Sequence, residues 1–175
     1  MADVLRVAYV VRSWPRLSQT FVLNEILALE RIGVRITVFT MSRSGETVVQ
    51  PEVAEVRATV HHLEASPLRR ARAHLGVAAR APWRYVCTLA FALTRRRLLG
   101  GYTQSGALVA FDRAVLVAVG LGVRRGHPPV HVHAHFAHDP ALVGLLARRL
   151  TGSTFSFTAH ARDLYQIPVA ALRGR

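Results

Sequence analysis

The sequence predicts an α/β fold of the Rossmann-like type, with a parallel five-strand sheet in the order 3-2-1-4-5 and helices on both faces. The first evidence is that two apolar runs, Leu5–Val11 and Val34–Thr40, flank a segment with apolar residues at helical spacing, Thr20–Arg31. Residues 130–158 repeat this pattern of strand, helix and strand. Right-handed crossovers on both sides of the first strand then give the predicted order. A length of 175 residues and a 51% apolar content are sufficient for one domain with a core.

The first helix has sequence signals at both ends. Ser18 is a suitable N-cap, Gly33 suits the C-terminal end, and Pro15 disfavours helix in the residue before it. Residues Arg12–Ser18 are therefore predicted to form a loop between the first strand and the first helix. The polar stretch 41–50 is predicted to form a second loop, after the second strand.

The middle of the chain is predicted to be mainly helical, because it is rich in Ala, Arg and Leu and contains few breaks. In chain order we predict a short helix at 51–57, a third strand at 58–63, and helices at 67–79, 82–98 and 105–124. Beyond the break at 128–129 we predict a strand at 130–136, a helix capped by Asp139 and ending at Leu150, a strand at 154–158 and the start of a helix at 168–172.

The strongly basic composition does not by itself indicate a nucleic-acid partner. The net charge is +13, and all 23 basic residues are Arg, spread along most of the chain. A nucleic-acid-binding domain would need a clustered basic face with interleaved aromatic residues, so we predict no such partner. An anionic membrane surface would still attract the Arg-rich helices, and the candidate contacts are Arg69, Arg70, Arg72, Arg80 and Arg84.

The sequence favours a cytoplasmic location, with a peripheral contact at the inner face of the membrane. Cys87 is the one cysteine, which excludes an internal disulfide and suits a reducing compartment. Residues 1–4 lack the features of a signal peptide. No apolar run approaches the ~20 residues that are needed to cross a bilayer.

The candidate functional residues gather at the predicted carboxyl ends of the strands, where ligands bind in open α/β sheets. The loop Arg12–Ser18 follows the first strand, and the first N–H groups of the next helix favour an anion or a hydroxyl-rich ligand. His160 follows the fifth strand, with Asp163 three residues later. Either side chain can hydrogen-bond a sugar hydroxyl, and His160 can also donate to a phosphate oxygen.

Three histidines of the fourth strand, His131, His133 and His135, are spaced two apart and therefore share one face. Three ligands at this spacing along an extended strand span too far to converge on one small ion, so we predict no metal site. We expect His131 to be deep and hydrogen-bonded, with His133 and His135 approaching the crevice.

Two segments of the chain resemble the family 4 glycosyltransferases, and in particular those that build exopolysaccharides such as colanic acid. The first is residues 13–26, SWPRLSQTFVLNEI. The second comprises residues 133–137, HAHFA, and residues 155–165, FSFTAHARDLY. The segments occur in the family's order, more than 100 residues apart.

This resemblance implies the N-terminal, acceptor-side half of a retaining glycosyltransferase with the GT-B architecture of two facing Rossmann-like domains. It implies that residues 1–165 form this domain and that residues 166–175 begin a continuation. The donor would be a nucleotide-sugar, used as a co-substrate without any further cofactor, and the acceptor a polysaccharide or a lipid-linked glycan. His160 would face the donor sugar-phosphate as the catalytic residue. The substrate-binding residues would be Arg16, Ser18, Gln19, Thr20, His133, His135 and Asp163.

The chain departs from the family pattern in two ways. Gln19 stands where the family usually has Glu, which removes a charge that could matter for acceptor binding. Family members are also about twice as long, and their second domain carries a pair of Glu eight positions apart that this sequence lacks. We therefore expect a truncated chain that does not transfer sugar alone. The alternative is a non-catalytic Rossmann-like binding module, or the remnant of a truncated gene.

Overall fold

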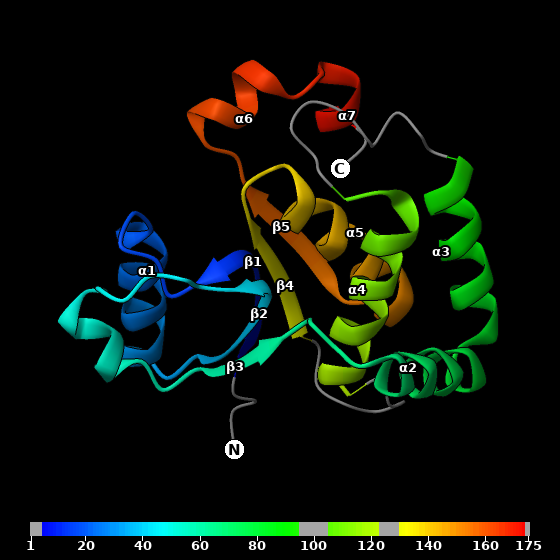
Figure 1. Ribbon diagram of the computed structural model, residues 1–175, viewed down its shortest axis with the longest axis horizontal. Coiled ribbons are helices and arrows are strands. Elements are labelled where there is room, and N and C mark those ends of the chain that lie inside the picture. Colours follow the sequence, from blue (N-terminus) through cyan, green and yellow to red (C-terminus); the bar gives the residue numbers. More distant parts are fainter. Residues whose placement is uncertain (1–4, 95–104, 123–129, 174–175) are drawn as a thin grey trace.

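A computed structural model describes residues 5–94, 105–122 and 130–173. Its centre is a parallel five-strand sheet in the order β3-β2-β1-β4-β5, which confirms the predicted topology (Figure 1). The strands are β1 (Arg6–Trp14), β2 (Arg35–Arg43), β3 (Thr59–His62), β4 (Val130–His135) and β5 (Thr154–Thr158). The sheet reverses its direction of growth between β1 and β4, which is the point where such sheets bind ligands.

Helices cover both faces of the sheet, as Figure 1 shows: α1 lies on one side, and α2 to α5 lie on the other. The helices are α1 (Thr20–Arg31), the 3-10 helix η1 (Pro51–Glu55), α2 (Pro67–Arg80), α3 (Pro82–Thr94), α4 (Ala107–Gly120), α5 (Asp139–Thr151), α6 (Ala161–Gln166) and α7 (Val169–Arg173). The predicted ends of the helices at 98 and 124 lie outside the described residues.

The alternation of β4 divides its side chains between two cores. Val130, Val132 and Ala134 belong to the larger core under α2 to α5. The three histidines occupy the opposite face, toward α1, as their spacing predicted. The smaller core on that side contains Tyr9 and Trp14 from β1 and the apolar stripe of α1. The histidine face and α1 therefore enclose a polar site next to an apolar core.

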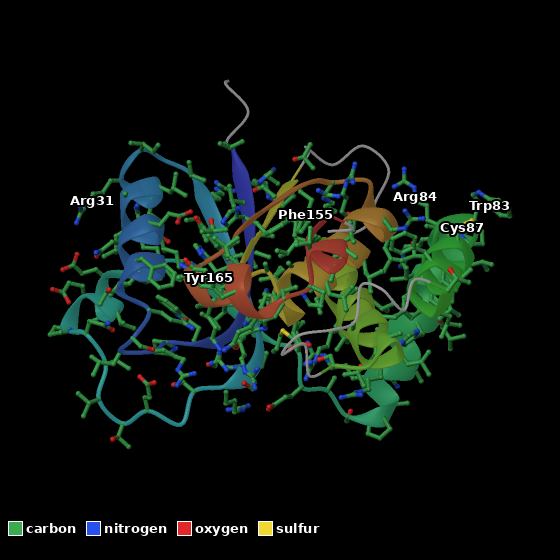
Figure 2. All side chains as sticks on the ribbon, turned by 90° about the horizontal axis from the view of Figure 1, so that it is seen from above. Arg31, Trp83, Arg84, Cys87, Phe155 and Tyr165 are labelled. Carbon is green, nitrogen blue, oxygen red and sulfur yellow. The ribbon has the colours of Figure 1, made fainter. Side chains whose placement is uncertain are left out.

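Both central strands are longer than predicted. Backbone pairing continues through Ser13 with Ser42 and Trp14 with Arg43, three residues beyond the predicted ends. Trp14 is 4% exposed in the smaller core, whereas Trp83 in α3 is 77% exposed. Figure 2 shows Trp83 beside Arg84 and Cys87 at the end of the molecule away from α1.

The ends of the helices differ from the predictions at two N-caps. Gln19, not Ser18, is the N-cap of α1, and His138, not Asp139, is the N-cap of α5. In neither helix does the N-cap side chain accept a hydrogen bond from the backbone, so the side-chain preference that guided the predictions does not decide the boundary. Gly33 does close α1 in a left-handed conformation, with φ of +87°. Helix α6 was not predicted.

A half-buried polar network joins three helices of the larger layer. The His74 ring in α2 contacts the Tyr85 hydroxyl in α3 at 2.7 Å and Asp112 Oδ1 in α4 at 3.1 Å. Arg70 in α2 also pairs with Asp112, at 3.0 Å. This network explains why an acidic residue interrupts the otherwise apolar sequence of α4.

Gly120 has a packing role, because a Cβ atom there would lie 2.5 Å from Cε1 of Phe39, which is buried in the core. Gly120→Ala is expected to lower the free energy of unfolding by ~1–3 kcal/mol, since overpacking exceeds the gain in helix propensity. Gly76→Ala in α2 is the control: its Cβ would meet the flexible end of Arg80, so the helix should gain up to ~1 kcal/mol. Urea unfolding of both variants checks this, and equal effects would contradict it.

Candidate functional site

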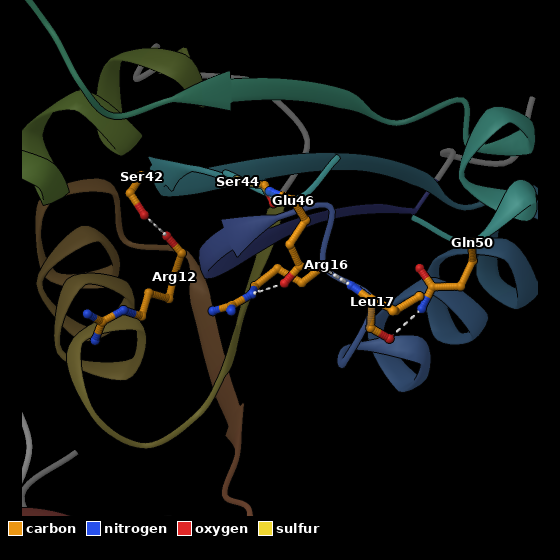
Figure 3. Close-up of polar contacts among 7 residues, drawn as sticks. All are labelled: Arg12, Arg16, Leu17, Ser42, Ser44, Glu46 and Gln50. Atoms are coloured by element: carbon orange, nitrogen blue, oxygen red, sulfur yellow. Dashed lines mark hydrogen bonds and ion pairs between the residues drawn. The ribbon is translucent and has the colours of Figure 1, made fainter. Parts of the chain in front are cut away.

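The loop between β1 and α1 is held by the segment that follows β2 (Figure 3). Arg16 Nε donates to Glu46 Oε1 at 2.9 Å, and the Leu17 N–H donates to the other carboxylate oxygen. Gln50 Nε2 donates to the Leu17 carbonyl at 2.6 Å, and Ser42 Oγ donates to the Arg12 carbonyl at 3.1 Å. The position of this loop at the sheet edge thus depends on residues about thirty positions later.

The four predicted site residues of this segment have different environments. Arg16 is paired with Glu46, while Ser18 and Thr20 are exposed to solvent. Gln19 is 5% exposed, and within the described part of the chain its Oε1 atom has no hydrogen-bond partner. A Glu at this position would be a buried carboxylate. Phe21, two residues after Gln19, makes ring contacts with His135 and His160.

Glu46→Gln is expected to loosen this loop. The Leu17 N–H and then Arg16 lower the pKa of Glu46 below its ordinary value of 4.5. The two contacts therefore favour the ionised carboxylate. Their contribution to the stability of the loop is complete above pH 4.5, and it is lost as the pH falls through the lower pKa of the folded state. At neutral pH, hydrogen exchange should show less protection of the Leu17 amide in Glu46→Gln than in the unmutated chain. In the unmutated chain, the protection should be lower under acid conditions than at neutral pH.

Glu52→Gln, at an exposed carboxylate in η1, is the control for this loop experiment. It should leave the exchange of the Leu17 amide unchanged. Equal protection in the two variants would show that Glu46 does not hold the loop.

The second part of the site lies between β1, β4 and α1. The Tyr9 hydroxyl donates to Glu25 Oε1 in α1 at 2.5 Å. The Tyr9 ring stacks on His135 at a centroid distance of 5.2 Å and meets the edge of His133 at 5.5 Å. Glu25 Oε2 lies 3.6 Å from His135 Nε2. Tyr9 and Glu25 were not predicted as site residues.

Hydroxyls of β5 orient the first two histidines. His131 contacts Thr154 Oγ1 and Ser156 Oγ, at 2.8 and 2.7 Å. His133 contacts the same Ser156 oxygen at 2.7 Å and Thr158 Oγ1 at 3.2 Å. These side-chain contacts confirm that His131 is hydrogen-bonded, although the residue is half-buried rather than deep.

His135 differs from the other two, because it is 1% exposed and neither ring nitrogen has a hydrogen-bond partner among the described residues. Burial, followed by His133 and His160, lowers its pKa to about 3. Burial also lowers the pKa of His133, with Glu25 acting in the opposite direction. His135 is therefore a neutral imidazole at neutral pH, with two unused polar atoms.

His160 follows β5 and packs against two phenylalanine rings. Its ring lies 4.5 Å from Phe21 and 4.7 Å from Phe136, between centroids. Its Nε2 atom is buried and has no hydrogen-bond partner within the described segments. Phe136 has a φ of +76°, which is costly for a bulky residue and occurs most often at functional sites.

Asp163 positions the turn that carries His160. The carboxylate is 0% exposed, and Oδ2 accepts from the backbone N–H groups of Ala137 and His160, each at 2.9 Å. It thereby joins the ends of β4 and β5. Asp163 thus has a structural role at this turn, and its contact with a substrate stays a prediction.

A cavity of about 230 Å³ lies at the carboxyl ends of β1 and β2, on the face covered by α4 and α5. Its polar lining consists of Arg12, Ser42, Ser105, Arg113 and Asp139. Arg113 donates to the Ser105 hydroxyl at 2.6 Å, and the Ser105 N–H donates to Asp139 at 2.8 Å. Burial lowers the pKa of Arg113, and Asp139 opposes this shift. Guanidinium and hydroxyl groups of this kind suit an oxygen-rich ligand. No sequence motif marked Arg113 or Ser105 as a candidate site residue.

The structure thus gathers His133, His135 and His160 in one cluster, with Phe21 and Glu25 from the predicted N-terminal motif. In scans against protein-family models, curated proteins and solved structures, nothing matched this chain. The fold is a Rossmann-like α/β sheet.

Proposed function

We propose that this chain forms the acceptor-side domain of a retaining, exopolysaccharide-type glycosyltransferase. The observation that carries the proposal is the contact of Phe21 with His160, 4.5 Å apart between ring centroids. These residues belong to the two segments that resemble the family, and they meet at the carboxyl edge of the sheet. The faces of Phe21 and Phe136 suit the apolar face of a sugar ring, and His160 Nε2 suits a hydroxyl or phosphate oxygen.

A titration followed by amide NMR tests this proposal. Glucose, galactose, fucose, glucuronic acid and a panel of UDP- and GDP-hexoses are the probes. We expect the largest shifts at Phe21, Glu25, His135 and His160, and smaller shifts along the β1–α1 loop. Shifts confined to α2 and α3, or no shifts at millimolar probe, would contradict a sugar site here.

The same experiment does not distinguish a transferase domain from a non-catalytic sugar-binding module, and a transfer assay separates them. Orientation of donor and acceptor together contributes ~7–11 kcal/mol to such reactions, and the proposal assigns the donor to a second domain. Residues 1–175 alone should therefore release no nucleoside diphosphate from the same panel. Transfer above that of a His160→Ala variant would mean that this domain holds a donor site of its own.

We also propose a peripheral contact with anionic membranes through α2 and α3. Among the described helices, none is long and apolar enough to cross a membrane. Exposed apolar side chains stand next to basic ones on α2 and α3; the apolar ones are Leu68, Leu75, Trp83, Val86 and Leu93. Arg69, Arg72 and Arg80 line one cavity of about 510 Å³, while Arg84 borders another. Arg70 is paired with Asp112, so we expect it to contribute less to this contact than the other arginines.

Arg69→Ala/Arg72→Ala is expected to reduce binding to anionic vesicles, since each Arg near the surface contributes ~1 kcal/mol. The control is Arg31→Ala/Arg35→Ala, which removes the same charge from exposed positions; Figure 2 shows Arg31 at the opposite end of the molecule from Arg84. Flotation with phosphatidylcholine vesicles, with and without phosphatidylglycerol, measures the effect. Equal binding to both vesicles, or equal loss in both variants, would contradict the proposed surface.

A further inference from the structure

We propose that Glu25, His133 and His135 form a zinc site that joins α1 to β4. Each residue offers one ligand atom, and the three atoms lie within 4.8 Å of one another. Two imidazoles and one carboxylate are a ligand set that zinc uses when the fourth position is left to water or substrate. The spacing of His131, His133 and His135 alone argues against a metal, because three histidines of one strand cannot converge on a single ion. In the structure a carboxylate from α1 takes the place of His131.

The ligand atoms must move closer together to bind one zinc ion. Zinc bonds of about 2.0–2.1 Å place tetrahedral ligand atoms about 3.3–3.4 Å apart. Glu25 Oε2 and His135 Nε2 are already 3.6 Å apart. The Glu25 side chain is 42% exposed and comes from a helix surface, so its rotamer can adjust without disturbing the core. The carboxylate also gives solvent ions a route to the buried imidazole.

His135 supplies the independent observation that points to a ligand. It is 1% exposed, and neither of its ring nitrogens has a hydrogen-bond partner in the described part of the chain. A buried polar atom without a partner costs ~1–3 kcal/mol, and coordination of an ion would remove that cost.

The neighbouring side chains already act as outer supports of the kind that metal ligands need. The Tyr9 hydroxyl donates to the Glu25 oxygen that does not face His135. His133 has a hydroxyl partner at each nitrogen, Ser156 and Thr158, so whichever nitrogen binds the ion, the other keeps a hydrogen bond that fixes the ring. Such outer contacts typically contribute about 10- to 100-fold to metal affinity.

The test is a titration of the metal-free, tag-free chain with zinc in competition with a fluorescent chelator. We expect one zinc per chain and a rise in the thermal midpoint, since an ion that binds the folded state stabilises it. Glu25→Gln and His133→Gln should each weaken binding by more than the about 10- to 100-fold effect of an outer contact, and Tyr9→Phe by that smaller amount. Cobalt in place of zinc should give the visible absorption of a four-coordinate ion.

The matched control is His61→Ala/His62→Ala on β3, which removes two histidines away from the proposed site and should leave zinc affinity unchanged. Circular dichroism establishes that each variant is folded, and Glu25→Gln, which preserves the size of the side chain, gives the decisive comparison. No binding at micromolar zinc, binding insensitive to Glu25→Gln, or binding lost in the β3 control would each overturn the proposal.

Discussion

Replacing His160 by alanine is expected to weaken sugar binding by about 10- to 100-fold. An unpaired polar group at a buried contact costs ~1–3 kcal/mol, and each 1.4 kcal/mol corresponds to a tenfold change in affinity. The ring also packs against Phe21 and Phe136, so its loss removes apolar packing at the site as well. Calorimetry with the sugar that gives the largest NMR shifts measures the effect.

Two further variants separate the role of His160 as a hydrogen-bond donor from its role in packing. His160→Gln retains a polar group and should recover part of the affinity, whereas Phe21→Ala retains His160 and removes one ring. His62→Ala, on the far side of the sheet, should bind as the unmutated chain does. Unchanged affinity in His160→Ala would exclude this histidine from the site.

Asp163→Ala is expected to lower the free energy of unfolding by ~2–5 kcal/mol, a large part of the ~5–15 kcal/mol that such domains have. The change leaves the N–H groups of Ala137 and His160 without their acceptor, and hydrogen bonds to a carboxylate are about twice as strong as neutral ones. Sugar affinity should fall as well, because the turn that carries His160 is released.

Asp163→Asn keeps one acceptor oxygen and should have about half the effect on stability. Glu55→Ala, at an exposed carboxylate, is the control and should be close to neutral. Urea unfolding gives the values. If Asp163→Ala retains full stability but loses sugar binding, then Asp163 contacts the ligand directly, as the family resemblance implies.

The sheet could be predicted because its determinants are local. Apolar runs and helical spacing mark β1, α1 and β2, and a period of two places the histidines of β4 on one face. The ends of β1 and β2 were missed because residues 13–14 and 42–43 pair through their backbones whatever their side chains are. The N-cap of α1 was missed for a related reason: no side-chain cap is present to give a signal.

The site could be predicted only in part, because half of it comes from contacts between distant segments. His133, His135 and His160 follow from their positions at strand ends. Phe21 and Glu25 border the buried stripe of α1 that contains Val22 and Ile26, and only the rotation of the helix on the sheet turns them toward β4. Glu46, which holds the β1–α1 loop, lies in a segment with no periodic pattern. Its contacts therefore could not be predicted from the spacing of residues.

The unequal burial of the two tryptophans, Trp14 at 4% and Trp83 at 77%, gives the molecule two distinguishable fluorophores. An indole in an apolar core emits at shorter wavelengths and is protected from quenching by iodide. An indole in water emits at longer wavelengths and is quenched. Trp83→Phe therefore leaves a chain whose tryptophan emission comes from Trp14 alone, directly before the β1–α1 loop. In that variant, the binding of sugar or zinc near this end of the sheet can be followed by the fluorescence of Trp14.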